Sequence, residues 1–303
     1  MPMGAELALV TDALVRATPL MITGLAVALA FRGGVFNIGA EGQLLVGAIA
    51  ATAVTLAGQS ILGRGVVFVA LGAAAVAGGF WAAIAAELRR RFHVLEIIST
   101  IMLNFVAIHL VSFLVRGPLQ EPTHIYPQTE SLPAVARLPI LIPGSRLHLG
   151  FAVGVLTAVA LSWMFRRTAI GFRVRAIGAS PLAAFTAGRI DVSRNSFLVF
   201  LCSGALAGIA GGIEVTGVTF ALYENLSPGY GYTAIAVALI AGLNPLGIIA
   251  SGIFFGALET GASALQREFA VPSSLASVVE AALIIAVLTL SAVRNRRVLE
   301  RAS

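Results

Sequence analysis

Polar side chains interrupt an apolar stretch near the amino end, where the chain reads "GGVFNIGAEGQ" at 33–43. Asn37, Glu41 and Gln43 provide hydrogen-bond donors and acceptors that suit a polar, hydroxylated solute. In hydrocarbon each of them costs free energy unless it finds a polar partner. Gly33, Gly34 and Gly39 in the same stretch weaken a continuous helix. The stretch therefore predicts a broken helix that faces a water-accessible pathway.

Other interpretations of these side chains stay open. Asn37 can equally lie in a hydrated loop before a membrane span begins. Glu41 is harder to place in water because apolar sequence follows it at once. A structural hydrogen bond explains Glu41 as well as a contact with a transported solute does.

A second polar group lies in "EIISTIMLNF" at 96–105. Glu96, Thr100 and Asn104 stand four residues apart and share one face of a helix. A polar stripe on a membrane helix indicates either an aqueous route or hydrogen bonds to a neighbouring helix. We predict that Ser99, Thr100 and Asn104 line the same pathway as the first group, with interhelical bonding as the alternative for Asn104.

Other ionisable residues lie in or beside apolar runs. Glu214 and Glu280 fall near the expected ends of spans, where hydration is expected, and Glu259 lies deeper. Asp12 and Arg16, four residues apart, are expected to pair on one helix face. None of these carboxylates has the local arrangement of a hydrolase, so no catalytic residue is predicted.

Several chemistries are excluded by residue counts. All twenty basic residues are arginine, so the chain has neither a P-loop lysine nor a Schiff-base lysine. Cys202 is the only cysteine, and the four histidines show no paired ligand spacing. We therefore expect no metal site and no cofactor on this chain.

The composition is that of an integral membrane protein. Of 303 residues, 58% are hydrophobic and 11% are charged, whereas a soluble domain carries about 25% charged residues. The formal net charge of +6 comes from arginines in short connections between apolar runs. That distribution is typical of the positive-inside pattern of membrane proteins and argues against a nucleic-acid partner.

The apolar runs predict an all-α, polytopic helix bundle that forms one domain over residues 1–303. A helix needs about 20 mostly apolar residues to cross a bilayer. Nine segments are expected, of which the seventh is short for a full crossing: 15–31, 38–58, 65–86, 97–116, 149–165, 195–215, 232–243, 246–263 and 276–293.

Two longer connections fall on opposite sides if the arginine-rich tail is cytoplasmic. Fourteen of the twenty arginines then lie inside and the amino terminus lies outside. The proline-rich stretch 117–148 is expected to be an external, partly ordered loop, and 166–194 a cytoplasmic loop. Within the latter, Ser180 suits an N-cap, Pro181 a first helical position and Gly188 a stop. This short helix either presses into a groove of another protein or lies at the lipid headgroups.

Three motifs in order, "GGVFNIGAEGQLLVGA", "EIISTIMLNFVA" and "RVRAIGASPLAAFTAGRI", resemble the membrane permeases of ABC importers for nucleosides and simple sugars. This group is related to the ribose and branched-chain amino-acid permeases. The resemblance covers the chain from about Thr18 to Arg297. Only Met1–Ala17 precedes the stretch "PLMITGLAVA", where several nucleoside permeases carry an additional helix, so the position of the amino terminus is the weakest part of the predicted topology.

The resemblance implies a working unit in the plasma (inner) membrane of a bacterium. Two permease subunits, identical or different, would work with two cytoplasmic ATP-binding cassette subunits that hold ATP and Mg, and with an extracytoplasmic substrate-binding lipoprotein. It also implies that the "RAIGASPLAA" segment is the coupling helix that contacts the ATPases. The coupling positions would be Gly178, Ser180, Pro181, Ala183, Ala184 and Gly188.

The predicted function is therefore import of nucleosides or simple sugars by alternating access, powered by partner ATPases. One rival is an ion-coupled secondary transporter of small polar solutes, in which Glu41 or Glu259 would bind the coupling ion. A second rival is an intramembrane enzyme, which would need these carboxylates or His109.

Overall fold

A computed structural model describes residues 4–188 and 190–269, with isolated positions at 278, 281, 282, 285, 286 and 289. Within these residues the chain is helical apart from its connections, and ten α-helices follow one another. They are α1 (Ala5–Arg32), α2 (Ala40–Leu62), α3 (Val66–Phe92), α4 (Glu96–Val115), α5 (Leu149–Arg167), α6 (Ala169–Ala179), α7 (Pro181–Gly188), α8 (Val192–Glu214), α9 (Tyr230–Ile240) and α10 (Pro245–Phe269).

Seven of these helices are long and apolar enough to cross a membrane, namely α1, α2, α3, α4, α5, α8 and α10. They correspond to the first six and the eighth predicted spans, so the polytopic helical fold is confirmed and the count of nine is not. The seventh predicted span is α9, whose eleven residues extend about 16 Å, roughly half of a bilayer core of about 30 Å. The ninth, 276–293, lies outside the continuously described residues.

The first helix begins ten residues before the predicted start of the first span. Thr11 and Thr18 bond their hydroxyls to backbone carbonyls of the preceding turn, Thr11 to Leu7 O at 3.0 Å and Thr18 to Leu14 O at 3.0 Å. Polar side chains that are satisfied within their own helix do not end it. The sequence therefore predicted the start of the first helix too late in the chain, at residue 15 instead of Ala5.

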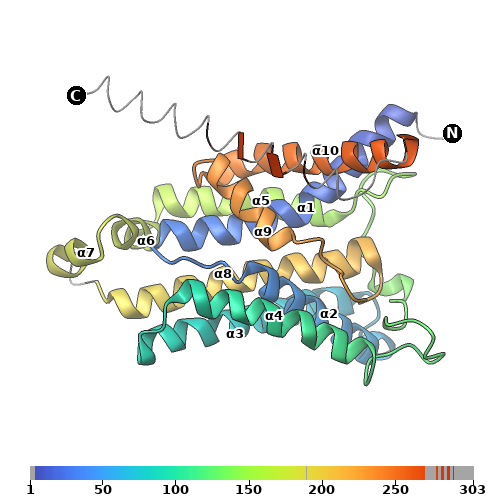
Figure 1. Ribbon diagram of the computed structural model, residues 1–303, viewed down its shortest axis with the longest axis horizontal. Helices are drawn as coiled ribbons and strands as arrows, with labels where there is room; N and C mark the ends of the chain where they lie inside the picture. Colours follow the sequence, from blue (N-terminus) through green and yellow to red (C-terminus); the bar gives the residue numbers. More distant parts are fainter. Residues whose placement is uncertain are drawn as a thin grey trace.

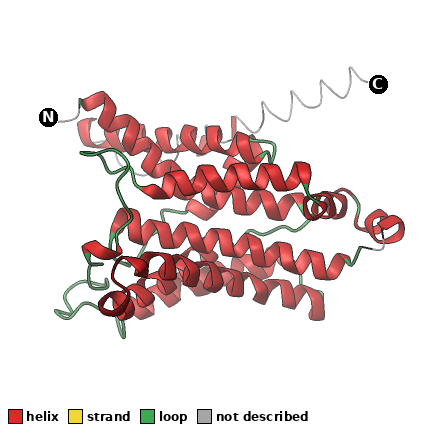
Figure 2. Ribbon diagram, turned by 180° about the vertical axis from the view of Figure 1, so that it is seen from behind, coloured by secondary structure: helices red, strands yellow, loops and turns green. Residues whose placement is uncertain are grey.

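The bundle has two layers (Figures 1 and 2). α1, α5, α9 and α10 form one layer and α2, α3, α4 and α8 the other, and α1 contacts α8 between them. Small residues allow α8 to approach its neighbours closely. A Cβ on Gly208 would collide with Ala74 O of α3. Without a hydrophobic drive between helices in lipid, such close packing is what holds them together.

The two long connections lie at opposite ends of the bundle (Figure 1). The stretch 117–148 contains one short 3₁₀ turn, Ala134–Ala136, and is fixed to the residues that follow α8: Thr129 N donates to Leu222 O at 2.8 Å and Leu138 N to Thr216 O at 2.9 Å. At the other end, α6 and α7 extend beyond the long helices.

Candidate functional site

The Gly33–Gly39 segment joins α1 to α2 without helical structure. It runs from the end of α1, next to α6, into the centre of the bundle, where α2 begins (Figure 1). Val35 N donates to Ala30 O at 3.0 Å, and Phe36 N donates to Glu96 Oε1 at 2.8 Å. Val35 is completely buried. Non-helical backbone at membrane depth is tolerated only when protein or a wet cavity satisfies it, and here protein groups do so.

Asn37 and Gln43 pair their amide groups, each donating to the oxygen of the other at 2.9 Å. Asn37 Nδ2 also donates to Ser203 Oγ at 2.9 Å, and Asn37 Oδ1 accepts from Gly39 N at 3.0 Å. Ser203 Oγ in turn donates to Ala26 O at 2.8 Å. The buried Asn37 amide thus uses both of its donors and both lone pairs of its oxygen.

Asn104 of α4 joins three further parts of the bundle. Its Oδ1 accepts from Gly42 N at 2.8 Å, and its Nδ2 donates to Ile38 O at 3.0 Å and to Tyr232 Oη at 3.2 Å. These bonds connect α4 to the Gly33–Gly39 segment, α2 and α9. We call Asn37, Gln43, Asn104 and Ser203 the amide cluster.

Of the other predicted pathway residues, Glu41 bonds the start of α9, whereas Ser99 and Thr100 bond within α4. Glu41 Oε2 accepts from Gly231 N at 2.6 Å, at the start of α9, and its carboxylate also bonds Ser227. Ser99 Oγ donates to Glu96 O at 3.1 Å and Thr100 Oγ1 to the same oxygen at 2.6 Å.

The structure thus brings the six predicted pathway residues to one buried region. Hydration of Asn37 in a loop is ruled out, because Asn37 is 0% exposed. Asn104 forms the interhelical bonds that were its alternative explanation. Contact of any of the six with a solute stays a prediction.

The expected short helix is α7, which begins at Pro181 as predicted and includes Gly188, the predicted stop. Ser180 caps it, since Ala183 N donates to Ser180 Oγ at 3.3 Å. Leu182 and Phe185 are 74% and 62% exposed on a helix that extends away from the bundle (Figure 2). Two exposed apolar side chains on a projecting helix indicate a contact surface for another molecule.

Gly178 of α6 lies against the turn that ends α1. A Cβ on Gly178 would collide with Arg32 O, and a Cβ on Gly34 would lie 3.2 Å from Gly178 Cα. Gly34 has a φ of 70°, a conformation that favours glycine. α6 therefore touches the backbone of the Gly33–Gly39 segment directly, with no side chain between them.

Four ionisable side chains lie in the half of the bundle opposite α7, and we call Arg16, Glu214, Tyr230 and Glu259 the acid cluster. Arg16 lies 3.8 Å from Glu259, measured from Nη1 to Oε2, and Glu214 interacts electrostatically with both. Glu214 is 3% exposed, and its Oε2 has no hydrogen-bond partner among the described residues.

Two sequence expectations about this cluster were wrong. Glu214 is not hydrated at a helix end, because the chain continues as a π-helical turn, Val215–Thr219, that the loop 117–148 covers. Arg16 lies next to Glu259, and the described residues contain no ion pair between Arg16 and Asp12. Glu280 lies outside the described residues.

Sequence reasoning did not find Ser203, Gly231 or Tyr232 as partners of the pathway residues. Ser203 carries a hydroxyl group within the run of small residues on α8, and such a polar group in a close-packed helix could have predicted an interhelical hydrogen bond. Gly231 acts through its backbone, so its residue type gives no signal. Among the described residues, no group of three or more His, Cys, Asp or Glu side chains could hold a metal ion.

Comparisons with known proteins cover nearly the whole chain. A family model described as "Branched-chain amino acid transport system / permease component" matches residues 9–288. The glucose ABC transporter permease protein TsgB13 of Haloferax volcanii is 38% identical over 95% of this chain and 78% of its own length. The guanosine ABC transporter permease protein NupP of Bacillus subtilis is 38% identical over 95% of this chain and 83% of its own length.

A third relative, the nucleoside ABC transporter permease protein NupB of Lactococcus lactis, is 30% identical over 88% of this chain and 75% of its own length. No solved structure gives a significant match to the chain.

Proposed function

The chain belongs to the family of permease components of branched-chain amino acid transport systems, and from its relatives named for glucose, guanosine and nucleosides we propose that it moves nucleosides or simple sugars across the membrane. It is a multi-pass permease subunit of an ATP-driven importer, a transport component and not an enzyme. The ion-coupled and enzymatic rivals do not fit this family. The proposal concerns the solute, the route and the partners.

The observation that carries the solute assignment is the neutral chemistry at the centre of the bundle. Asn37, Gln43 and Asn104 contribute amides, Ser203 a hydroxyl and Tyr232 a phenol. These groups now bond one another, so the route is closed at the amide cluster. When the helices part, the same donors and acceptors are available to the hydroxyls and ring atoms of a neutral solute. Relatives named for glucose, guanosine and nucleosides support this class.

The partners follow from the two ends of the bundle. Of two ATPase subunits, which bind ATP and Mg, one would dock on α7 of this chain through Leu182 and Phe185. A substrate-binding lipoprotein would deliver the solute to the 117–148 side, which we assign to the exterior of a bacterial plasma membrane together with the amino terminus. A second permease, identical or different, would complete the transporter. Transport is then inward.

Coupling would travel through the contact between Gly178 and Gly34. The contact is backbone on backbone, so a movement of α6 that follows α7 displaces the Gly33–Gly39 segment without a side-chain rearrangement. That segment carries Asn37, and through Asn37 the displacement reaches the amide cluster. The coupling positions Gly178, Ser180, Pro181, Ala183, Ala184 and Gly188 lie on this path from α7 to α6.

The solute assignment is tested with the assembled transporter in vesicles that enclose ATP, with its binding protein outside. Radiolabelled guanosine, glucose and leucine are offered separately. We expect ATP-dependent accumulation of guanosine or glucose and none of leucine. Accumulation of leucine without either of the others would overturn the assignment.

The coupling path is tested in the same vesicles with Gly178→Ala, which forces α6 away from α1. Uptake should fall at least about tenfold, the factor given by about 1.4 kcal/mol of lost coupling free energy, while ATP hydrolysis by the complex continues. Ala179→Ser, on the exposed neighbour of Gly178, is the control and should leave uptake unchanged. If uptake and hydrolysis fall together in Gly178→Ala, the contact serves assembly and not coupling.

A further inference from the structure

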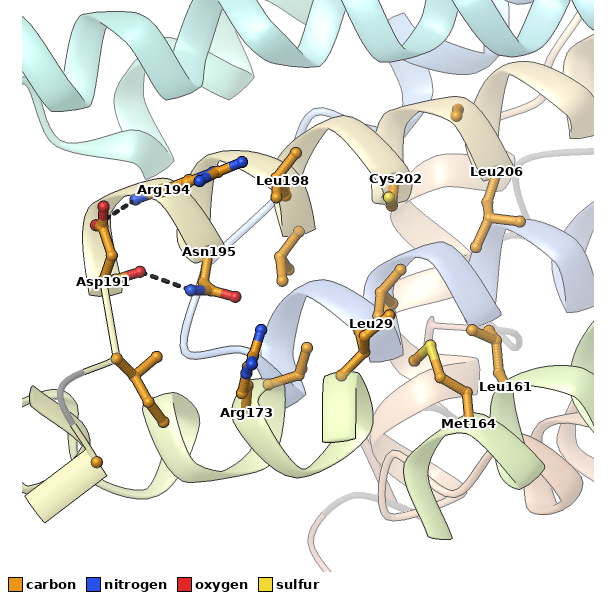
Figure 3. Close-up of a pocket in the computed structure, with 16 residues that line it drawn as sticks. Leu29, Leu161, Met164, Arg173, Asp191, Arg194, Asn195, Leu198, Cys202 and Leu206 are labelled. Carbon is orange, nitrogen blue, oxygen red and sulfur yellow. Dashed lines mark hydrogen bonds between the residues drawn. The ribbon is translucent and has the colours of Figure 1, made fainter. Parts of the chain in front are cut away.

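A groove of about 790 Å³ opens between α8 on one side and α1, α5 and α6 on the other (Figure 3). Its walls are apolar along most of its length, with Leu29, Leu161, Met164, Leu198 and Leu206 among the lining residues. Leu198 is 45% exposed. We call this feature the α8 groove. A neutral, hydroxylated solute gains little from such walls, so the groove does not belong to the proposed route.

Polar groups gather only at the end of the groove nearest α7. Arg173 of α6 and Arg194 of α8 line this mouth together with Asp191 and Asn195, and Figure 3 shows Arg173 extending into the gap toward Asn195. Asp191 is committed to its own helix, because its Oδ1 accepts from Arg194 N at 2.9 Å. Among the described residues neither guanidinium forms an ion pair or a side-chain hydrogen bond. The mouth therefore carries two guanidinium groups against one carboxylate, and its net charge is positive.

The length of the groove matches one leaflet of a bilayer. Arg194 and Leu206 both line it and are twelve residues apart on α8, a distance of about 18 Å along the helix axis. One leaflet of a hydrocarbon core of about 30 Å is about 15 Å deep. A molecule with its charge at Arg194 therefore reaches Leu206 with a tail one leaflet long.

We propose that the α8 groove binds one anionic phospholipid from the leaflet on the α7 side. The acyl chain lies along the leucine and methionine walls, and the phosphate lies between Arg173 and Arg194. Basic sites between membrane helices recognise anionic headgroups through charge, and burial of each chain methylene adds to the affinity. Such a lipid would fill the space between α6 and α8 and so hold the base of α7 in place.

Cys202 provides the measurement, because it lines the groove, is exposed, and is the only cysteine of the chain. The assembled transporter is placed in nanodiscs of pure phosphatidylcholine or of phosphatidylcholine with a minor fraction of phosphatidylglycerol. The rate of reaction of Cys202 with a small apolar maleimide is then measured. Two arginines should favour phosphatidylglycerol about 30-fold over phosphatidylcholine, so a few per cent of it should protect Cys202.

Arg173→Gln combined with Arg194→Gln should abolish the protection by phosphatidylglycerol. Arg175→Gln removes a charge from the same helix outside the groove and should leave the protection intact. Binding of phosphatidylglycerol counted by native mass spectrometry should fall by one molecule per permease in the double variant only. This count does not depend on transport, so the test stands whether or not the proposed solute is correct.

Three results would overturn the proposal. Equal labelling of Cys202 in both lipid mixtures would mean that the groove does not distinguish the headgroup. Protection by soluble glycerol phosphate in nanodiscs of phosphatidylcholine alone would mean that the site takes a small anion. A crosslink from Cys202 to the second permease subunit would mean that protein, and not lipid, fills the groove.

Discussion

The amide cluster and the acid cluster both place polar groups deep in the bundle, yet they are satisfied differently. In the amide cluster the groups are neutral, and Asn37 alone makes four hydrogen bonds. In the acid cluster the groups are ionisable, and Glu214 keeps an oxygen without a hydrogen-bond partner among the described residues. The hydrogen bonds of the amide cluster therefore stabilise the folded state, whereas the unpartnered oxygen in the acid cluster destabilises it.

The residues of the amide cluster stabilise the closed state, whereas Glu214 of the acid cluster is present although its burial lowers the stability. A buried polar atom without a partner costs about 1–3 kcal/mol, and a buried charge costs more. No hydrogen bond to Glu214 Oε2 within the described residues recovers this cost, and we predict that the carboxyl group contributes to a step of transport. Substitutions in the two regions should therefore change the free energy of unfolding in opposite directions.

The largest effect is expected for Asn37→Leu. The change leaves Gly39 N, the amide of Gln43 and the hydroxyl of Ser203 with fewer partners in a dry environment, so the free energy of unfolding should fall by about 4 kcal/mol or more. The yield of folded permease should fall with it. Thermal unfolding in detergent measures both. Gln59→Leu removes an amide that makes one long bond, of 3.4 Å to Leu56 O, and is the matched control.

A double variant, Asn37→Leu with Gln43→Leu, distinguishes a network from general crowding. Replacing both members of an amide pair by apolar groups removes two of the orphaned atoms, so part of the lost stability should return. If the double variant is less stable than the sum of the single variants predicts, the side chains are needed for their volume and the amide cluster is not the reason for the loss.

The sequence predicted this region better than the acid cluster for a physical reason. Polar residues next to glycines and followed by apolar sequence indicate a break within 33–43, and the structure has a non-helical segment at Gly33–Gly39, with Glu41 and Gln43 already in α2. The same reasoning placed Glu214 in water, because position along a helix cannot reveal that the loop 117–148 folds back over Val215–Thr219. Ser180 and Pro181 fixed the start of α7 locally. The contact between Gly178 and Gly34 could be found only in the structure, because the two residues are 144 positions apart and leave no local pattern.

A smaller effect is expected from His148, whose ring lies against Gly217 of the π-helical turn and caps α5 by accepting from Gly150 N at 3.2 Å. Burial, with the neighbouring Arg146, lowers the pKa of His148 from 6.5 to about 4. The folded state thus resists a proton that the unfolded state accepts. The contribution to stability is fully present above pH 6.5, is lost as the pH falls from 6.5 toward 4, and amounts to at most about 3 kcal/mol.

Thermal unfolding at pH 7.5, 5.5 and 4.5 measures this loss. His148→Asn keeps an acceptor for the helix cap and should remove most of the difference between pH 7.5 and 4.5. His124 lies exposed in the same connection, and His124→Asn should retain the pH dependence of the wild type. A pH dependence that survives in His148→Asn would assign the loss of stability to other groups.

The smallest change in stability is expected for Glu214→Gln, and its sign is the sharpest test of the comparison. Glutamine has nearly the same shape, brings its own donors and removes an ionisable group from beside Glu259. The free energy of unfolding should stay within about 1 kcal/mol of the wild type or rise, as replacement of buried charges often produces. Uptake of the transported solute should nonetheless fall.

Glu130→Gln, an exposed carboxylate of the loop 117–148, is the control for charge alone and should change neither quantity. If Glu214→Gln unfolds as readily as Asn37→Leu, the carboxylate is a structural partner like the amides, and the two clusters do not differ in role. If uptake is unchanged while stability rises, the charge is a cost without a function in transport. A loss of uptake in a fully stable variant is the result that separates the two regions, because it requires the acid cluster to act on a step that the closed state does not contain.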